Sequence, residues 1–319
     1  KGRRGKYTGG HKYIFQMALS MLRAKTGYLW QKPEFSECLG KPLQAEAWHA
    51  LCEKNRATLL DVYKELGKGN HFKKGRDPFH AIASIVALQH PIGALFEMVA
   101  RMERSIPSTS QPSTNALHAR NILLVKMLIC NPLRVQQYAM MTWCADNTGN
   151  LYTGPDGEWR MRFEPVDFKN HYGAASQPYD VALSEWLRPD IDAYLSVYRP
   201  YFRDAAVSNS LFLPRGEKKG RTRDYLSAAV ISSTVLKLTR KFIPDCPGFS
   251  AHAFRHIIAT EYIKNNPNGF QVAANILHDR LETVMRAYAH LKVADGFSFW
   301  TAYLDRQIGS YQTQGAVNE

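Results

Sequence analysis

The chain has 319 residues and carries 41 Lys and Arg against 28 Asp and Glu, and its net charge of +13 favours a polyanionic partner. Its five cysteines are odd in number, widely spaced and without a C-x-x-C pair, which argues against a disulfide framework or a zinc site and for a reducing compartment. No apolar run approaches the roughly twenty residues of a membrane helix and no signal peptide is visible, so we expect a cytoplasmic protein without a membrane partner.

The first third of the chain is predicted to be a small helical bundle. Apolar residues recur there at three- and four-residue intervals over 14–22, 48–66, 79–86 and 92–102, and strand signals are almost absent. The whole chain is long enough for two domains with separate cores. We therefore expect residues 1–104 to form one helical and basic domain.

Three basic clusters lie on Gly-containing connections, at residues 1–6, 68–76 and 215–223. One charge run by itself is usually a solvated face. Residues 1–110, however, hold 18 Lys and Arg against 9 Asp and Glu, so the clusters in this part indicate sequence-tolerant phosphate contacts. The candidate phosphate-binding residues are Arg3, Arg4, Lys6, Lys73, Lys74, Arg76, Lys218, Lys219 and Arg221.

The stretch 105–115, S-I-P-S-T-S-Q-P-S-T-N, has no apolar periodicity and contains two prolines. This composition is typical of a linker, which would let the regions before and after it sit on different sides of a ligand. We therefore place a domain boundary here. A second domain is expected over 116–295, followed by a C-terminal tail over 296–319.

Two long cationic side chains lie at turns of the second domain. An apolar helix is predicted over 116–130, and Asn131-Pro132 is expected to begin a helix that runs to residue 143 and holds Arg134 in its first turn. A cation there opposes the helix dipole unless an anion is bound nearby. Residues 150–183 are predicted to form a small antiparallel sheet, and Lys169 opens its second turn. Either residue alone is most simply an exposed cation.

The last quarter of the chain follows predicted helices over 191–201 and 228–242 and carries an unusual set of polar residues. Its segments have the apolar periodicity of buried helices, where a single His or Tyr is most simply a core residue with a hydrogen-bond partner. Together, however, Arg, His and Tyr are what attack on a phosphodiester requires, because Tyr supplies a nucleophile, Arg binds phosphate oxygens and His moves protons. The set is His252, Arg255, His256, His278, Tyr288 and His290.

The pattern over about residues 116–291 resembles the tyrosine recombinases, a family of DNA breaking and rejoining enzymes. Its most specific part is H-A-F-R-H, followed 23 positions after Arg255 by a His and then by a Tyr within Y-A-H. The chain departs from the family's usual pattern at Gln137, where an acidic residue is common, and at Leu277, where Gly is usual. It also has one extra residue before the nucleophile. The residues that carry the resemblance are Arg134, Lys169, His252, Arg255, His278 and Tyr288.

The resemblance implies a mainly α protein with a small antiparallel β-sheet, built from a helical core-binding domain and an α+β catalytic domain. It implies that Tyr288 attacks the scissile phosphate and forms a 3′-phosphotyrosyl link, without metal or another cofactor. Arg134 and Arg255 would stabilise the developing negative charge, and Lys169 would be the general acid for the leaving oxygen.

The roles of the histidines stay open. His252 is the first choice for the Tyr proton and His278 for the phosphate or for orienting the nucleophile. His256 and His290 are interpreted as structural residues or as groups that support the catalytic side chains. Rival nucleophiles lack the Y-A-H context; they are Tyr262, Tyr303 and Tyr311.

The resemblance also implies a partner and an assembly. The partner is a double-stranded DNA core site with inverted repeats, bound in the bacterial or phage nucleoid by a homotetramer that recombines two sites through a Holliday junction, and accessory DNA-bending factors are left open. Alternatives are a telomere resolvase, a type IB topoisomerase-like enzyme and an architectural protein that does not cut DNA. The tail carries apolar residues for either a neighbouring protomer or the chain's own core, namely Phe297, Phe299, Trp300, Tyr303 and Leu304.

Overall fold

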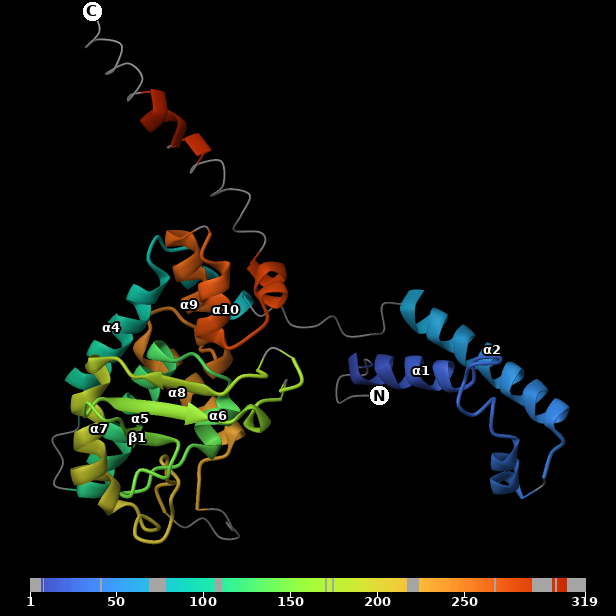
Figure 1. Cartoon of the computed structure of the whole chain (residues 1–319), viewed down its shortest axis with the longest axis horizontal. Helices are drawn as coiled ribbons and strands as arrows, with labels where there is room; N and C mark the ends of the chain where they lie inside the picture. The colour runs from blue at the N-terminus through green and yellow to red at the C-terminus, as the bar shows by residue number, and fades with distance from the viewer. Residues whose placement is uncertain are drawn as a thin grey trace, which may run out of the picture. The chain divides into compact units, whose positions relative to one another are not determined.

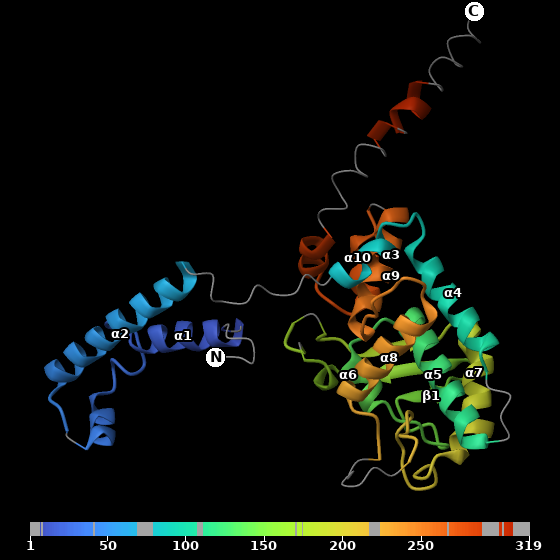
Figure 2. The same ribbon diagram turned by 180° about the vertical axis from the view of Figure 1, so that it is seen from behind.

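A computed structural model describes residues 7, 9–40, 42–68, 79–106, 111–169, 171–173, 175–216, 224–266, 268–288, 300–301 and 303–308. The chain divides into two compact units, Lys1–Asp77 and Pro78–Glu319 (Figures 1 and 2). All nine candidate phosphate-binding residues lie outside the described residues, and so do His290, Phe297, Phe299 and Tyr311.

The first unit is helical, as its apolar periodicity predicts. Helices α1 (Gly9–Met21) and α2 (Ala45–Lys68) pack on each other, and a 3-10 helix, η1 (Pro33–Leu39), lies between them in the chain. Trp48 is one of the few buried side chains here, and its indole Nε1 donates a hydrogen bond of 2.7 Å to the Leu29 carbonyl.

The division between the two compact units lies in the chain between Asp77 and Pro78, and the linker predicted over 105–115 lies within the second unit. A short 3-10 turn, η2 (His80–Ile82), leads into α3 (Ala83–Val86) and α4 (Pro91–Arg104), and these pack within the second unit. The apolar face of α4, which includes the fully buried Leu95 and Met98, is covered by α5, α8 and α9. Residues 112–115 of that stretch already belong to α5. The core that α4 joins depends on which surface covers its apolar face, and composition does not reveal this.

Helix α5 (Pro112–Cys130) is the centre of the second unit. Residues 122–129 are all buried, which is expected for a helix stretch that is apolar on every side except at Lys126. Figure 1 shows the sheet in front of α5, and Figure 2 shows α8 on the opposite side. Further elements are α6 (Val135–Met140), α7 (Arg188–Ala193), the π-helical turn η5 (Tyr194–Tyr198), η6 (Arg199–Tyr201), α8 (Ala228–Phe242), α9 (Ala251–Asn265) and α10 (Phe270–Leu277), followed by a helix over 281–288.

The predicted antiparallel sheet is confirmed. Strands β1 (Leu151–Thr153), β2 (Trp159–Phe163) and β3 (Tyr179–Ala182) pair in the order β1-β2-β3, with Met161 opposite both Leu151 and Val181. The side chains of β2 alternate between the core and the outer face, as the two-residue period of a strand requires. The mainly helical fold with one small sheet is therefore the fold class that the sequence predicts.

The helix predicted to begin at Pro132 is wrong in its start and its end. Helix α6 begins at Val135 and ends at Met140, and Arg134 is its N-cap residue in an extended conformation, with φ −67° and ψ 146°. A tight turn, in which Leu133 N donates to Asn131 O over 2.6 Å, separates α5 from α6. Beyond Met140 the chain leaves the helix to form bridges with Ser210 and Leu151.

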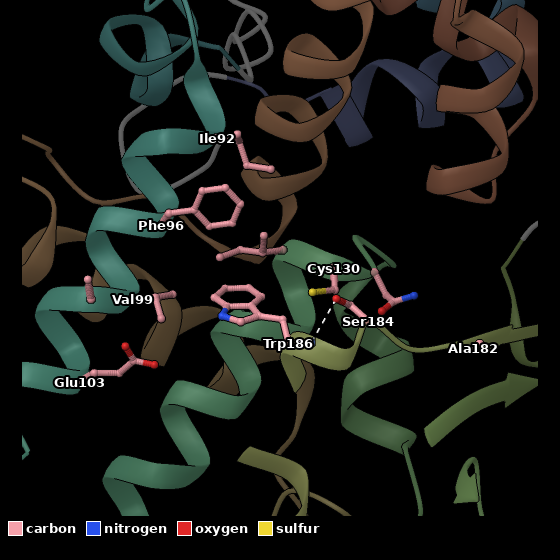
Figure 3. A pocket seen from close by; sticks show the side chains of 11 residues that line it. Ile92, Phe96, Val99, Glu103, Cys130, Ala182, Ser184 and Trp186 are labelled. Carbon is pink, nitrogen blue, oxygen red and sulfur yellow. Dashed lines mark hydrogen bonds between the residues drawn. The ribbon is translucent and has the colours of Figure 1, made fainter. Parts of the chain in front are cut away.

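A pocket of about 700 Å³ opens beside α4, the end of α5 and η4 (Glu185–Leu187), where the rings of Phe96 and Trp186 meet edge to face at 5.6 Å (Figure 3).

Among the described helices, none alone is long and apolar enough to cross a membrane, although one bent pair, His80–Val86 with Pro91–Arg104, meets that test by length and composition.

The described part of the C-terminal tail is a helical segment over 300–301 and 303–308. Trp300 and Tyr303 are exposed, and their rings stack at 5.8 Å.

Candidate active site

Two arginines that are 121 positions apart in the chain converge on one carboxylate oxygen. Nη2 of Arg134 lies 2.9 Å and Nη2 of Arg255 lies 3.2 Å from Oδ2 of Asp279. Arg134 comes from the start of α6 and Arg255 from the second turn of α9, so the packing of the second unit brings them together. The predicted pairing of these two residues in one site therefore agrees with the geometry, but Asp279 between them was not predicted.

Arg255 is buried, with 4% of its surface exposed. Its Nη1 donates a hydrogen bond of 2.6 Å to the Pro132 carbonyl, in the turn that leads to Arg134. Burial, and then the positive charge of Arg134, lowers the pKa of Arg255 to about 10, while Asp279 acts in the opposite direction. The guanidinium is thus positively charged at neutral pH, and its donors are fixed by a backbone carbonyl and a carboxylate.

His252 and His278 lie near the arginines and are neutral at physiological pH. Partial burial, followed by the charges of Arg255 and Arg134, lowers the pKa of His252. Burial also lowers the pKa of His278, and there the charge of Arg134 acts more strongly than that of Arg255. Two cations close together disfavour a third, so each ring keeps a nitrogen able to accept a proton.

His278 ends α10 in the left-handed conformation, with φ 47° and ψ 54°. Its ring packs between Phe168, at 4.4 Å, and Tyr179, at 5.3 Å. The Nε2 atom is buried and has no hydrogen-bond partner among the described residues. A buried polar atom without a partner is costly, so Nε2 is suited to a ligand that supplies one.

Tyr288 is buried, with 2% of its surface exposed, at the end of the helix over 281–288. Its hydroxyl lies 2.9 Å from Nδ1 of His256 and 3.5 Å from the carbonyl oxygen of Arg255. Its ring meets Phe79 edge to face at 6.0 Å. Burial raises the pKa of Tyr288 well above its ordinary value, so the hydroxyl is protonated in the DNA-free protein.

The hydrogen-bonding partner of Tyr288 is thus His256, which the sequence analysis interpreted as structural. His252, preferred there for the Tyr proton, lies one helical turn earlier, and its ring meets that of His256 edge to face at 5.1 Å. The i, i+4 spacing within H-A-F-R-H places both rings on one side of α9 and was the signal available for His256.

Lys169 lies in the turn after β2 and the 3-10 helix η3 (Pro165–Asp167), and it is exposed. It makes no hydrogen bond or ion pair with the residues that the structure describes. Its neighbour Phe168 packs on the ring of His278. The turn that carries Lys169 therefore borders the site, although no hydrogen bond or ion pair among the described residues joins Lys169 to the arginines.

Gln137 links the start of α6 to that same turn. It is buried, its amide Nε2 donates a hydrogen bond of 3.0 Å to the Asp167 carbonyl, and its backbone N donates to the Arg134 carbonyl at 3.0 Å. Gln137 stands where the tyrosine recombinases often have an acidic residue. Here a neutral amide, through its donor, ties the Arg134 segment to the segment before Lys169.

Within the described parts of the chain, no group of three or more His, Cys, Asp or Glu side chains is placed to hold a metal ion. The site as described consists of two arginines, a bridging carboxylate, three histidines and a buried tyrosine.

Comparisons with known proteins give matches among solved structures only. No protein-family model matches the chain, and no curated protein matches it. The XerH site-specific recombinase in a pre-cleavage complex with its difH substrate matches with a TM-score of 0.45 and 17% identity, over 65% of this chain and 51% of the XerH chain. A post-cleavage complex of XerH with palindromic difH matches with a TM-score of 0.47 and 16% identity, over 66% and 52%.

The XerA recombinase matches with a TM-score of 0.42 and 14% identity, over 66% of this chain and 63% of XerA. The aligned part thus spans about half the length of XerH.

Proposed function

We propose that the protein is a site-specific DNA recombinase that breaks and rejoins DNA through a covalent phosphotyrosine. The observation that carries this proposal is the convergence of Arg134 and Arg255 on one oxygen atom, close to a Tyr288 hydroxyl that is hydrogen-bonded to a histidine. Two guanidinium groups with a shared focus can hold a phosphate oxygen, and Tyr supplies an oxygen nucleophile.

The arginines bind the non-bridging oxygens of the scissile phosphate. As the phosphorus becomes five-coordinate, negative charge grows on these oxygens, and fixed cations in a partly buried site stabilise it strongly. Arg255 is suited to this role because its position is held by the Pro132 carbonyl. His278, whose Nε2 has no partner among the described residues, donates a further hydrogen bond to the phosphate in the tautomer protonated at Nε2.

Tyr288 attacks the phosphorus. The Tyr oxygen forms a bond to phosphorus, the bond from phosphorus to the 5′-oxygen breaks, and a 3′-phosphotyrosyl link remains. A protonated Tyr is a weak nucleophile, so its proton needs an acceptor, and Nδ1 of His256 lies within hydrogen-bond distance. We assign the proton from Tyr288 to His256, with His252 beside it.

Lys169 gives a proton to the leaving 5′-oxygen. Its turn borders the site through Phe168, and a long ammonium side chain on an exposed turn can reach a DNA backbone bound over the arginines. Rejoining is the reverse reaction, in which the 5′-hydroxyl of a second strand attacks the phosphotyrosyl link. Because the energy of the broken bond is kept in that link, no ATP is consumed.

The proposed partner is a double-stranded core site with inverted repeats, recombined by four protomers through a Holliday junction. The basic first unit contacts the backbone of this site, and the exposed aromatic residues of the tail, Trp300 and Tyr303, pack on a neighbouring protomer. Once the sequence of the core site is known, binding of the first unit to it and assembly of protomers on it can both be measured.

The experiment is to trap the covalent link. Genomic DNA from the organism that encodes the protein is incubated with it, covalent complexes are isolated under denaturing conditions, and the attached DNA is sequenced. Nicked oligonucleotides of the recovered site then measure adduct formation directly. We expect an adduct with the wild type and none with Tyr288→Phe, while Tyr262→Phe, which changes a rival tyrosine, keeps it.

Each other outcome contradicts part of the proposal. An adduct with Tyr288→Phe would show that another residue is the nucleophile. Relaxation of supercoiled plasmid without any recovered site or recombinant product would favour a type IB topoisomerase-like enzyme. Absence of an adduct with wild-type protein on DNA that it binds specifically would favour an architectural protein.

A further inference from the structure

Asp279 is the residue of the site for which the proposed reaction has no role. Its Oδ2 is the single atom on which Nη2 of Arg134 and Nη2 of Arg255 converge. Its other oxygen, Oδ1, accepts a hydrogen bond of 3.0 Å from the backbone N of Arg280. One carboxylate oxygen thus accepts hydrogen bonds from the two arginines, and the other accepts one from the backbone of its own loop.

We propose that Asp279 occupies the subsite for a non-bridging phosphate oxygen in the DNA-free protein, and that the phosphate of the DNA displaces it. The inference rests on the proposed function, because that function makes the two arginines the phosphate ligands. It adds a competing ligand supplied by the protein itself.

The donor geometry supports this inference. A carboxylate oxygen and a phosphate oxygen accept hydrogen bonds from guanidinium groups at similar distances, so either can take the same position between two arginines. The two Nη2 atoms lie 2.9 and 3.2 Å from Oδ2, within the range of N–H···O hydrogen bonds. A phosphate oxygen that used both donors would therefore take the place of Oδ2.

The charges of the site also support displacement of Asp279 by phosphate. Arg134 and Arg255 carry two positive charges, Asp279 carries one negative charge, and the lowered pKa values leave His252 and His278 neutral. A phosphodiester that entered beside Asp279 would meet a like charge at the same donors. The five-coordinate intermediate carries up to two negative charges, which the arginines balance fully only after Asp279 has left.

Asp279 lies on a segment from which it can leave without opening the core. Its side chain keeps 14% of its surface exposed and that of Arg134 keeps 30%, so the ion pair faces solvent on one side. It follows His278, whose left-handed conformation ends α10, and it precedes the helix over 281–288. That helix carries Tyr288, so release of Asp279 acts on the same segment that holds the nucleophile.

The test measures binding of inorganic phosphate to the full chain by titration calorimetry, in a buffer of low ionic strength without other oxyanions. Asp279→Asn keeps the shape of the side chain and removes its charge. Glu282→Gln is the matched control, because Glu282 is exposed on the same segment and makes no ion pair with the described residues. We expect Asp279→Asn to bind phosphate at least about tenfold more tightly than the wild type, since one opposing charge at contact distance is removed.

The control and a double variant locate the effect. Glu282→Gln should stay within about twofold of the wild type, because an exposed charge is screened by solvent. In Arg134→Gln/Asp279→Asn the gain should disappear. Phosphate affinity of Asp279→Asn equal to or weaker than that of the wild type would overturn the proposal and make Asp279 a support for the arginines.

A second measurement covers the case in which Asp279→Asn is unstable, because the variant leaves a buried arginine with a weaker partner. Thermal unfolding with and without phosphate reports binding through the rise in Tm, even when the variant starts from a lower Tm. We expect a larger rise for Asp279→Asn than for the wild type and Glu282→Gln, and an equal or smaller rise would contradict the proposal.

Neither measurement uses DNA cleavage. A wild-type adduct without a phosphate gain in Asp279→Asn would refute this inference alone. A phosphate gain without any wild-type adduct would refute the proposed function and leave Asp279 as a competitor at an anion site.

Discussion

The Nδ1 atom of His256 lies 2.9 Å from the hydroxyl of Tyr288, across 32 positions of sequence. The rings of His256 and Tyr288 both contact Phe79, which comes from the segment before α3. In the DNA-free protein the proposed nucleophile is therefore held inside the fold by a histidine and an aromatic ring. Tyr288 has to leave this position, or the DNA has to approach it closely, before it can reach a phosphate.

His256, more than His252, is expected to control the rate of Tyr288 attack. We predict that His256→Gln slows adduct formation on a nicked core site by about 10²–10⁴-fold, the usual contribution of a positioned general base. His252→Gln, one turn earlier on the same helix, should have the smaller effect. The measurement is the single-turnover rate of adduct formation against pH, and a larger loss with His252→Gln would return the role to His252.

The burial of Tyr288 predicts a loss of stability at high pH. Burial raises the pKa of its hydroxyl above the ordinary value of 10.0, so the folded protein keeps a proton that the unfolded chain loses. The stabilisation is complete below about pH 10 and decreases above it, by about 1.4 kcal/mol per pH unit for one proton.

Urea unfolding between pH 9 and pH 11 tests this prediction. The stability of the wild type should fall more steeply than that of Tyr288→Phe, and the difference between the two isolates Tyr288 from the other buried tyrosines. Tyr172→Phe removes a hydroxyl from a side chain that is 93% exposed and should follow the wild type. Parallel curves for the wild type and Tyr288→Phe would show that the hydroxyl is not buried in solution.

Lys169 can be tested as the general acid by changing the leaving group. Lys169→Ala is expected to slow cleavage of a normal core site by about 10²–10⁴-fold. A substrate with sulfur in place of the bridging 5′-oxygen should restore the rate, because a thiolate leaves without a proton. If the sulfur substrate is cleaved as slowly as the normal one by Lys169→Ala, the lysine binds DNA and donates no proton.

Lys126 forms two ion pairs that are expected to stabilise the second unit. Lys126 of α5 is buried, with 6% of its side chain exposed, and its Nζ lies 2.7 Å from Glu103 and 2.6 Å from Asp190. It also lies 4.9 Å above the ring of Trp186. We predict that Lys126→Met destabilises the protein by about 2 kcal/mol, less than the roughly 3–5 kcal/mol of a fully buried pair, because both carboxylates are partly exposed.

Urea unfolding at pH 7 measures this loss. Lys237→Met is the matched control, since Lys237 is exposed on α8 and makes no ion pair with the described residues, and it should change the free energy of unfolding by less than about 0.5 kcal/mol. A change in Lys126→Met no larger than in this control would show that the paired lysine contributes nothing net.

Local sequence patterns predicted most of the elements but misplaced both ends of α6. The periodicity of three to four residues located α4, α5, α8 and α9, and alternation located the sheet. The start of α6 at Val135 and the packing of α4 were missed. The reason is that Asn131-Pro132 satisfies the rules for a helix start as well as those for a turn, and a polar linker does not tell which core the preceding helix covers.

What the sequence by itself determined is the set of residue types and their order: an arginine before α6, a lysine at a β-turn, H-A-F-R-H on α9 and a tyrosine after α10. Only the tertiary structure decided which of these residues contact one another. Asp279 on Arg134 and Arg255, and His256 on Tyr288, join residues that are 24 to 145 positions apart. Periodicity reports which face of an element is apolar, but such contacts depend on how separate elements pack, and a loop aspartate has no periodicity to reveal it.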